Sequence, residues 1–373
     1  MREFIDGSEV VARAAINSGC NFFSGYPITP ATSILLHMLK ELPKIGGTAI
    51  QAEDEISAMG FCIGAALSGA RVMTATSGPG ISLYSESIGA AIMCEVPLVI
   101  VDCQRMGPAT GGATTVAQGD VQFLRWGTSG GYPVIVLAPS SLAECYSLTQ
   151  RAFELAEIFR SPVFLALDKD LVLTSSTVDI TEISKQIMPI RPTATFNENY
   201  LPFAIKNLQD TPLFSPYGGS NTVRMTASSH NEAGFLVKDP KIVNQLNDHL
   251  VAKIDQHIDK ISMIKADLQP GSQILLISFG SPSQAMLEAV SEARSRGKLV
   301  SSLIILSLWP VPEKMIIACL EGIHKIYVIE LNHGQYRREI DRLAKPDQLV
   351  NGINRIDGEL ITTKEILEKT GLR

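Results

Sequence analysis

The sequence predicts an α/β protein in which a doubly wound domain is followed by a second, smaller α/β domain. Strongly apolar runs such as Pro97–Cys103 (PLVIVDC) and Val163–Leu167 alternate with helical segments. Continuous apolar strands between helices indicate a parallel sheet that is covered on both faces. The alternation fades after residue 175 and starts again near residue 269, which indicates a connecting region between two such units.

The first 175 residues alternate between helical and extended patterns. Asp6 or Ser8 can cap a helix that runs to about Asn17. A second helix is expected after Pro30, because proline is favoured in a first helical turn. Further helices are expected over residues 55–68, 81–93 and 142–158. Strands are expected over residues 22–23, 48–51, 71–76, 97–103, 134–137 and 163–167. These elements form one predicted domain, residues 1–175.

Residues 176–268 are expected to connect the two domains. The stretch 176–238 is rich in Pro, Asn, Ser and Thr and has no clear period, and such stretches are usually functional or wrapped over a surface. A helix is predicted over 240–264. The α/β pattern then returns in residues 269–373. Its expected elements are a strand at 273–279, a helix at 283–296, strands at 299–308 and 325–331, a short helix after Pro312, and a final helix, strand and helix.

Composition restricts the classes of function. The chain has 373 residues, 45% of them hydrophobic, and a formal net charge of −6. Nucleic acid is not expected as a partner, because neutralising phosphates requires a basic face. No membrane segment is expected, since no run approaches the roughly 20 apolar residues of a span. The N-terminal MREFIDGSE lacks the apolar core of a signal peptide, so we expect a cytoplasmic protein.

The six cysteines form no CxxC pair, and most of them lie in apolar stretches. This pattern is typical of reduced, buried thiols in a cytosolic protein. The sequence shows neither the ligand spacing of a zinc site nor the clustered cysteines of a self-contained iron–sulfur centre. We therefore expect no metal ligands in this chain.

Four segments stand where a predicted strand ends, which is where open α/β sheets bind their ligands. They are Ser24–Pro30 (SGYPITP), Gln51–Glu55 (QAEDE), Thr76–Gly80 (TSGPG), and Arg105 with the glycine-rich loop after it. Three of them have an ordinary alternative: a βα turn for the first, acids that complement a helix dipole for the second, and a solvated arginine or structural ion pair for Arg105. An arginine directly after a buried strand is nevertheless well placed to grip a carboxylate with two parallel hydrogen bonds.

The helix that follows Glu55 is built largely from small residues, among them Ser57–Gly60 and Gly64–Ala66. The helix dipole explains the acids at its start, but it does not explain the small residues. We therefore predict that another surface packs closely against this helix.

Together these residues resemble the α subunits of 2-oxoacid:ferredoxin oxidoreductases, which are thiamine-diphosphate enzymes, and most closely those of the 2-oxoglutarate:ferredoxin type. The resemblance covers nearly the whole chain, and the combination of YPITP, EDEI and TSGPG is specific. It is carried by GYPITP (25–30), QAEDEISAMG (51–60), GAALSGARVMTATSGPGISL (64–83), the QR–GP–TG region (104–111), VAQGDV (116–121), SSHNEAG (228–234), FGS (279–281), WPVP (309–312) and IELNHGQ (329–335). The first domain is then expected to be the pyrimidine-binding domain of thiamine enzymes, and the last to resemble the transketolase C-terminal domain.

The resemblance also implies roles for residues in the four segments. The catalytic glutamate of the family hydrogen-bonds the pyrimidine ring of thiamine diphosphate and lies nine residues before a glycine that matches Gly64, which selects Glu55. Glu53 and Asp54 are then capping or interface acids. Thr29 and Arg105 match the positions that contact the 2-oxoacid. The remaining expected cofactor contacts are Tyr26, Pro27, Ile28, Ser77, Gly78 and Pro79.

The family resemblance implies partners as well. The chain has neither the Gly-Asp-Gly…Asn segment that usually anchors the diphosphate through Mg²⁺ nor clustered cysteines for a [4Fe-4S] centre; Asp120 lacks the context of that segment. A β subunit is expected to supply both, with γ and possibly δ subunits and with ferredoxin as electron acceptor.

The implied reaction is the coenzyme A-dependent oxidative decarboxylation of 2-oxoglutarate to succinyl-CoA and CO2. Departures from the family pattern, at Ala31, Ala109 and Gly112-Ala113, fall in the substrate and loop region. Pyruvate or a branched-chain 2-oxoacid therefore stays an alternative substrate, and a non-catalytic scaffold subunit stays an alternative role.

Overall fold

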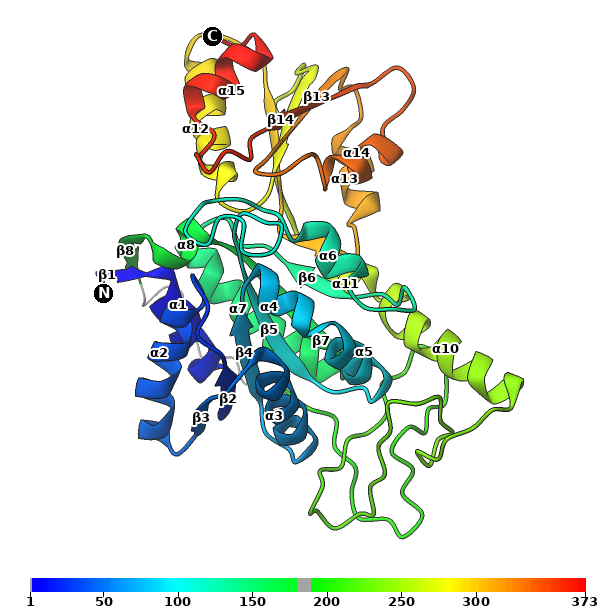
Figure 1. Ribbon diagram of the computed structural model, residues 1–373. Coiled ribbons are helices and arrows are strands. Elements are labelled where there is room, and N and C mark those ends of the chain that lie inside the picture. Colours follow the sequence, from blue (N-terminus) through cyan, green and yellow to red (C-terminus); the bar gives the residue numbers. More distant parts are fainter. Residues whose placement is uncertain (1, 180–188) are drawn as a thin grey trace.

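The computed structural model describes residues 2–179 and 189–373, so that residues 180–188 of the expected connecting region lie outside the described residues (Figure 1). The first sheet has the strand order β12-β6-β7-β5-β4-β2-β3, and all its neighbours are parallel except β12 and β6. Its strands are β2 (Phe22–Gly25), β3 (Thr48–Gln51), β4 (Val72–Thr76), β5 (Leu98–Gln104), β6 (Ile135–Leu137), β7 (Pro162–Asp168) and β12 (Ser307–Trp309). The predicted doubly wound domain is therefore present.

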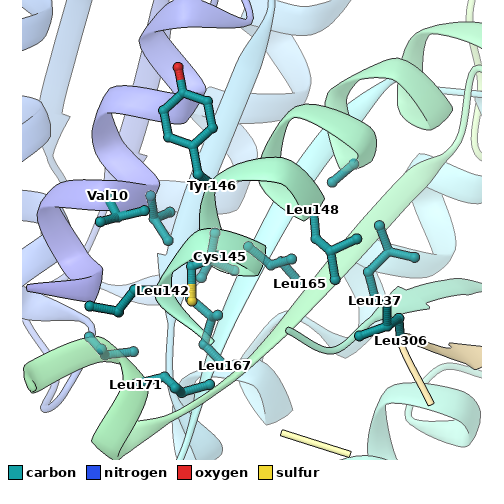
Figure 2. Packing of buried hydrophobic residues seen from close by; sticks show 14 of the residues in the cluster. Val10, Leu137, Leu142, Cys145, Tyr146, Leu148, Leu165, Leu167, Leu171 and Leu306 are labelled. Carbon is teal, nitrogen blue, oxygen red and sulfur yellow. The ribbon is translucent and has the colours of Figure 1, made fainter. Parts of the chain in front are cut away.

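Helices cover both faces of this sheet. The helices of the first domain are α1 (Gly7–Asn17), α2 (Thr32–Glu41), α3 (Glu55–Leu67), α4 (Gly78–Leu83), α5 (Ser85–Met93), α6 (Val121–Trp126), α7 (Leu142–Phe159) and α8 (Lys169–Leu173), with a short 3-10 turn, η1 (Leu42–Ile45). Side chains of α1, α2 and α7 pack into one core and those of α3, α4 and α5 into another. Figure 2 shows the first core, where Cys145 and Leu148 of α7 lie beside Leu165 of β7.

The helix expected over 81–93 is in fact two helices. α4 begins earlier, at Gly78, because Pro79 occupies a first-turn position, and it ends at Leu83; Tyr84 separates it from α5, which begins at Ser85. The buried Tyr84 ring packs into the core, and its hydroxyl lies 2.8 Å from Thr74 Oγ1. This contact holds the junction of the two helices against β4.

The last domain contains a second sheet, with the order β14-β13-β10-β11-β9. Its strands are β9 (Ile264–Asp267), β10 (Ile274–Ser278), β11 (Ser301–Ile305), β13 (Lys325–Glu330) and β14 (Leu349–Asn354), and its helices are α12 (Pro282–Ser295), α13 (Glu313–Cys319), α14 (Arg337–Leu343) and α15 (Thr363–Thr370). β9 is antiparallel to β11 and the other pairs are parallel. Residues 299–308, expected to be one strand, divide into β11 and β12, and β12 joins the first sheet.

The connecting region differs from expectation at both ends. The helix expected over 240–264 is α10 (Pro240–Asp255) and α11 (Ile258–Ile261), after which the chain enters β9. Near its start, β8 (Ser175–Asp179) pairs antiparallel with β1 (Arg2–Asp6), which the sequence pattern does not reveal. Between residue 189 and α10 the described backbone forms turns and isolated bridges, as expected from its composition. In the part of the chain that the structure describes, no helix combines the length and apolar character needed to cross a membrane.

A buried ionic network fastens this connecting region to the first domain. Glu95 and Lys253 are both buried, and Lys253 Nζ donates to Glu95 Oε2 at 2.6 Å. Arg160, also buried, donates from Nη1 to the Pro202 and Pro212 carbonyls, each at 3.1 Å. Burial raises the pKa of Glu95, but the positive charges beside it, Lys253 foremost, hold it well below its usual range.

Replacing Lys253 by methionine should lower the free energy of unfolding by about 3–5 kcal/mol, because the buried Glu95 carboxylate loses its cation. Since the folded-state pKa of Glu95 is lowered, this contribution is fully present above the unfolded pKa of about 4.3 and is lost progressively as the pH falls from there toward the much lower folded pKa. Urea unfolding at pH 7 and at about pH 2.5 measures both effects. Lys314→Met removes an exposed ion pair to Asp259 and should change little; an equal loss in both variants would contradict the assignment.

Candidate functional site

The four segments singled out in the sequence meet at one edge of the first sheet. β2, β3, β4 and β5 are mutually parallel, so their carboxyl ends lie on the same side. Ser24–Pro30 continues from β2, Glu55 follows β3, Ser77 follows β4, and Arg105 follows β5. Open α/β sheets bind their ligands at this edge. The fold therefore brings together residues that are up to 80 positions apart in the chain, as the numbering of Gly25 and Arg105 shows.

The three acids before α3 have different environments. Asp54 is the N-cap of α3, and its Oδ1 accepts a hydrogen bond from the Ser57 backbone N–H at 2.6 Å. Glu53 is exposed, whereas Glu55 is 7% exposed. The capping role therefore belongs to Asp54, and Glu55 is the acid that is held away from water.

Gly80 presses the start of α4 against Glu55. A Cβ placed on Gly80 would lie 3.0 Å from Glu55 Oε1 and 2.0 Å from Thr76 Oγ1, which is closer than real side chains approach. Only glycine fits there. The hydroxyls of Thr76 and Ser77 are both buried without a hydrogen-bond partner in the described structure. Unpartnered buried hydroxyls beside a buried carboxyl are typical of a site built to receive a polar ligand.

Arg105 and Thr29 are in direct contact. Arg105 is 4% exposed, and its Nη1 donates to the Thr29 carbonyl at 2.8 Å. Thr29 itself is exposed. Arginine has five N–H donors, so this contact leaves most of the guanidinium available to an anion.

The other expected cofactor contacts in this loop, Tyr26, Pro27 and Ile28, are not joined to Glu55 or Arg105 by the contacts described above. Tyr26 is exposed, while Pro27 and Ile28 are half-buried, and Ile28 packs against the core. Among the described residues no hydrogen bond joins Tyr26 to Glu55 or to Arg105. The roles of these three residues stay predictions from their position in the loop.

A cavity of about 420 Å³ opens between the two domains at this edge. Gly78, Pro79 and Asp120 line it from the first domain, and Asn332 and His333 line it from the last. A slightly larger cavity, of about 460 Å³, lies within the connecting region, between residues 201–233 and α10, but none of the predicted site residues lines it. The cavity beside Gly78 is therefore the one that belongs to the candidate site.

The sequence analysis missed a group of acids near this cavity, of which Asp102 and Asp168 are buried and Asp120 is half-buried. Burial raises the pKa of Asp120 to about 6, although the Arg105 charge opposes the rise. Burial also raises the pKa of Asp168 to about 7 and that of Asp102 well above its usual value. An acid inside the apolar run PLVIVDC is a signal that could have identified Asp102. Within the described residues, no group of three or more His, Cys, Asp or Glu is arranged to hold a metal ion.

Comparisons with known proteins identify both domains. Residues 13–247 match the family model for pyruvate flavodoxin/ferredoxin oxidoreductase, thiamine diphosphate-binding, and residues 272–366 match pyruvate:ferredoxin oxidoreductase core domain II. A 2-oxoglutarate synthase subunit KorA from Methanothermobacter thermautotrophicus is 40% identical over 98% of this chain and 96% of that protein. A ketoisovalerate oxidoreductase subunit VorB from the same organism is 33% identical over 98% of this chain and 96% of that protein.

A solved structure has the same fold. It is a 2-oxoglutarate:ferredoxin oxidoreductase from Magnetococcus marinus with 2-oxoglutarate, coenzyme A and succinyl-CoA bound. The TM-score is 0.93 at 28% identity, and the match covers all of this chain but only 65% of the longer chain in that structure. The matched domains and relatives agree with the resemblance inferred from YPITP, EDEI and TSGPG. The chain therefore belongs to the 2-oxoacid:ferredoxin oxidoreductase family and corresponds to its subunit with the thiamine-diphosphate-binding domain.

Proposed function

We propose that this chain is the α subunit of a 2-oxoglutarate:ferredoxin oxidoreductase. The complex converts 2-oxoglutarate and coenzyme A to succinyl-CoA and CO2 and passes the released electron pair to ferredoxin. The observation that carries the proposal is the pair formed by a buried Glu55 and a buried Arg105 at one sheet edge. The 40% identity to a 2-oxoglutarate synthase subunit supports the choice of substrate.

The residues around Glu55 fit the pyrimidine half of thiamine diphosphate. The buried carboxyl, the unpartnered hydroxyls of Thr76 and Ser77, and the close approach of Gly80 form a tight polar cradle. When bound, thiamine diphosphate supplies a centre that stabilises a carbanion. Glu55 holds or releases a proton at the pyrimidine nitrogen, a task that suits a carboxyl kept from water. Ser77, Gly78 and Pro79 shape the wall of the site.

Arg105 binds the carboxylate of the 2-oxoacid. Its guanidinium is held at one nitrogen by the Thr29 carbonyl, and its remaining donors can form two parallel hydrogen bonds to a carboxylate. Thr29 also offers a hydroxyl to the carboxylate or keto oxygen. Tyr26, Pro27 and Ile28 are proposed to complete the pocket from the same loop.

The exposed face of α3 supports a partner subunit. Ile56 and Phe61 are 56% and 48% exposed, and a Cβ on Gly60 or Gly64 would meet nothing within 4 Å. This exposed apolar face of α3, with room for a closely packed neighbour, begins beside Glu55, the proposed catalytic residue. We propose that a β subunit packs there and supplies the Mg²⁺-bound diphosphate site and the [4Fe-4S] cluster, with γ and possibly δ subunits completing a cytoplasmic complex.

A branched-chain 2-oxoacid is the second candidate substrate. The 33% identity to a ketoisovalerate oxidoreductase subunit favours it over pyruvate, but the identity is lower than to the 2-oxoglutarate synthase subunits. A scaffold role without catalysis is less favoured, since it gives no reason for burying Glu55 and Arg105.

Glu55→Gln should lower the kcat of the assembled complex by about 10²–10⁴-fold, because the amide keeps the shape but cannot exchange a proton. Glu53→Gln should keep near wild-type activity, since Glu53 is exposed. Asp54→Asn should do the same, because asparagine is an equally good N-cap. Steady-state rates with thermal unfolding as a folding check test all three. Near wild-type turnover by Glu55→Gln would contradict the assignment and favour the scaffold reading.

With coenzyme A present, the purified complex should reduce a viologen dye with a kcat/KM for 2-oxoglutarate that exceeds those for pyruvate and 2-oxoisovalerate by more than about tenfold. The physical basis is the extra carboxylate of 2-oxoglutarate, since discrimination is largest where a site binds a polar group that the competitor lacks. A higher value for 2-oxoisovalerate would replace 2-oxoglutarate by the branched-chain alternative.

Phe61→Asp should prevent the β subunit from copurifying with this chain, because it places a charge in the proposed apolar interface. Leu36→Asp is the matched control, since Leu36 is 58% exposed on α2, which covers the opposite face of the sheet. Affinity purification followed by subunit and iron analysis gives the readout. Undiminished recovery of the partner and its iron with Phe61→Asp would place the interface elsewhere.

A further inference from the structure

Arg105 carries a buried donor that the contacts described above leave without a partner. Its Nη1 donates to the Thr29 carbonyl at 2.8 Å, whereas its Nε is buried and has no hydrogen-bond partner. A buried charged donor that lacks an acceptor loses its hydration without compensation. The environment of Nε should therefore contain a group that compensates the loss.

Asp120 carries a buried acceptor that also lacks a hydrogen-bond partner among the described residues, its Oδ2 atom. This oxygen and Arg105 Nε each lie 3.9 Å from the point that a Cβ on Gly78 would occupy, so the two atoms flank the same position. A Cβ on Gly119 would lie 3.3 Å from the Arg105 carbonyl oxygen, which shows how closely the Asp120 segment packs against Arg105. Residues from two loops thus direct opposite, unpartnered charges toward one place.

The neighbouring charges that act on Asp120 differ from those that act on Asp102. The Arg105 charge acts on Asp120, where it opposes the effect of burial on the pKa of the carboxyl. The charges that act on Asp102 are those of Asp120 and Asp168. Asp168 is already held by Gln118, whose Nε2 donates to its Oδ2 at 2.9 Å. Asp120 is therefore the acid of this group that interacts electrostatically with Arg105, and it also lines the cavity.

We propose that Asp120 is a positioning residue for Arg105: its carboxylate orients the guanidinium from the Nε side by charge, without a direct ion pair in the described structure, so that the outer guanidinium nitrogens face the carboxylate of the 2-oxoacid. This inference rests on the proposed role of Arg105 as the substrate-carboxylate site. Of the five N–H donors of arginine, the Thr29 carbonyl takes one, and the Nε donor lies near the Asp120 carboxylate without bonding to it. The other three, on Nη1 and Nη2, remain for the substrate. A guanidinium oriented by one hydrogen bond and by a nearby negative charge loses less conformational freedom when the substrate binds.

In the assembled complex, Asp120→Asn should raise the KM for the 2-oxoacid about tenfold, because the isosteric amide lacks the negative charge that orients the guanidinium. The KM for coenzyme A and the kcat should stay close to wild type. Asp120→Glu keeps the charge and should recover part of the loss. The Kd of an unreactive 2-hydroxy dicarboxylate, measured by calorimetry, should rise in parallel with the KM.

Asp170→Asn is the matched control, since Asp170 is a half-buried acid that accepts from Ser281 Oγ at 2.9 Å. It should leave the 2-oxoacid KM unchanged. If Arg105→Met raises this KM and Asp120→Asn does not, the positioning role is wrong while the proposed function stands. If Arg105→Met leaves it unchanged, the substrate site lies elsewhere and both fail. A parallel change of kcat and both KM values in Asp120→Asn would mean a general structural defect and would overturn the inference.

Discussion

The parallel pairing of β2, β4 and β5 is the constraint on which the rest of the structure depends. Parallel strands end on the same side of the sheet, so the segments after them meet there regardless of their separation in sequence. Helices cover the faces of the sheet but not this edge. Polar groups such as Arg105, Asp102 and the Ser77 hydroxyl are consequently buried there without a full set of partners. Local departures from complete hydrogen bonding are expected where a protein binds a ligand.

The two domains are joined at the same edge by one well-satisfied side chain. Gln118 Nε2 donates to Asp168 and to the Phe279 carbonyl, and Gln118 Oε1 accepts from the Leu331 N–H. The Gln118 backbone carbonyl also accepts from Asn332 Nδ2 at 3.0 Å. These contacts connect the loop that carries Asp120 with the last domain. The wall of the cavity is therefore fastened to the last domain by several hydrogen bonds.

Local signals were sufficient for most of the fold, and non-local pairing explains what they missed. The start of α1, capped by Asp6 as one of the two predicted candidates, and the strand Thr48–Gln51 are correctly predicted, because a capping residue and short-range pattern define them. β9 and β12 could not be assigned, since which sheet a short strand joins depends on partners far along the chain. The candidate site likewise combines features that local sequence signals predict with features that depend on non-local packing. The four strand-end segments were found from their residues, but the partial burial of Asp120 depends on packing between the domains, which no neighbouring residue reveals.

The position of β12 determines how the chain can be divided. β12 belongs to the last third of the sequence, yet it pairs with β6 and so covers what would otherwise be an open border of the first sheet. Unpaired sheet borders invite intermolecular pairing and aggregation. A gene fragment that stops before Ser307 would carry every predicted site residue and still leave the backbone of β6 exposed. The domain that carries the predicted site residues thus has its sheet closed by a strand of the last domain, even though that domain contributes none of those residues.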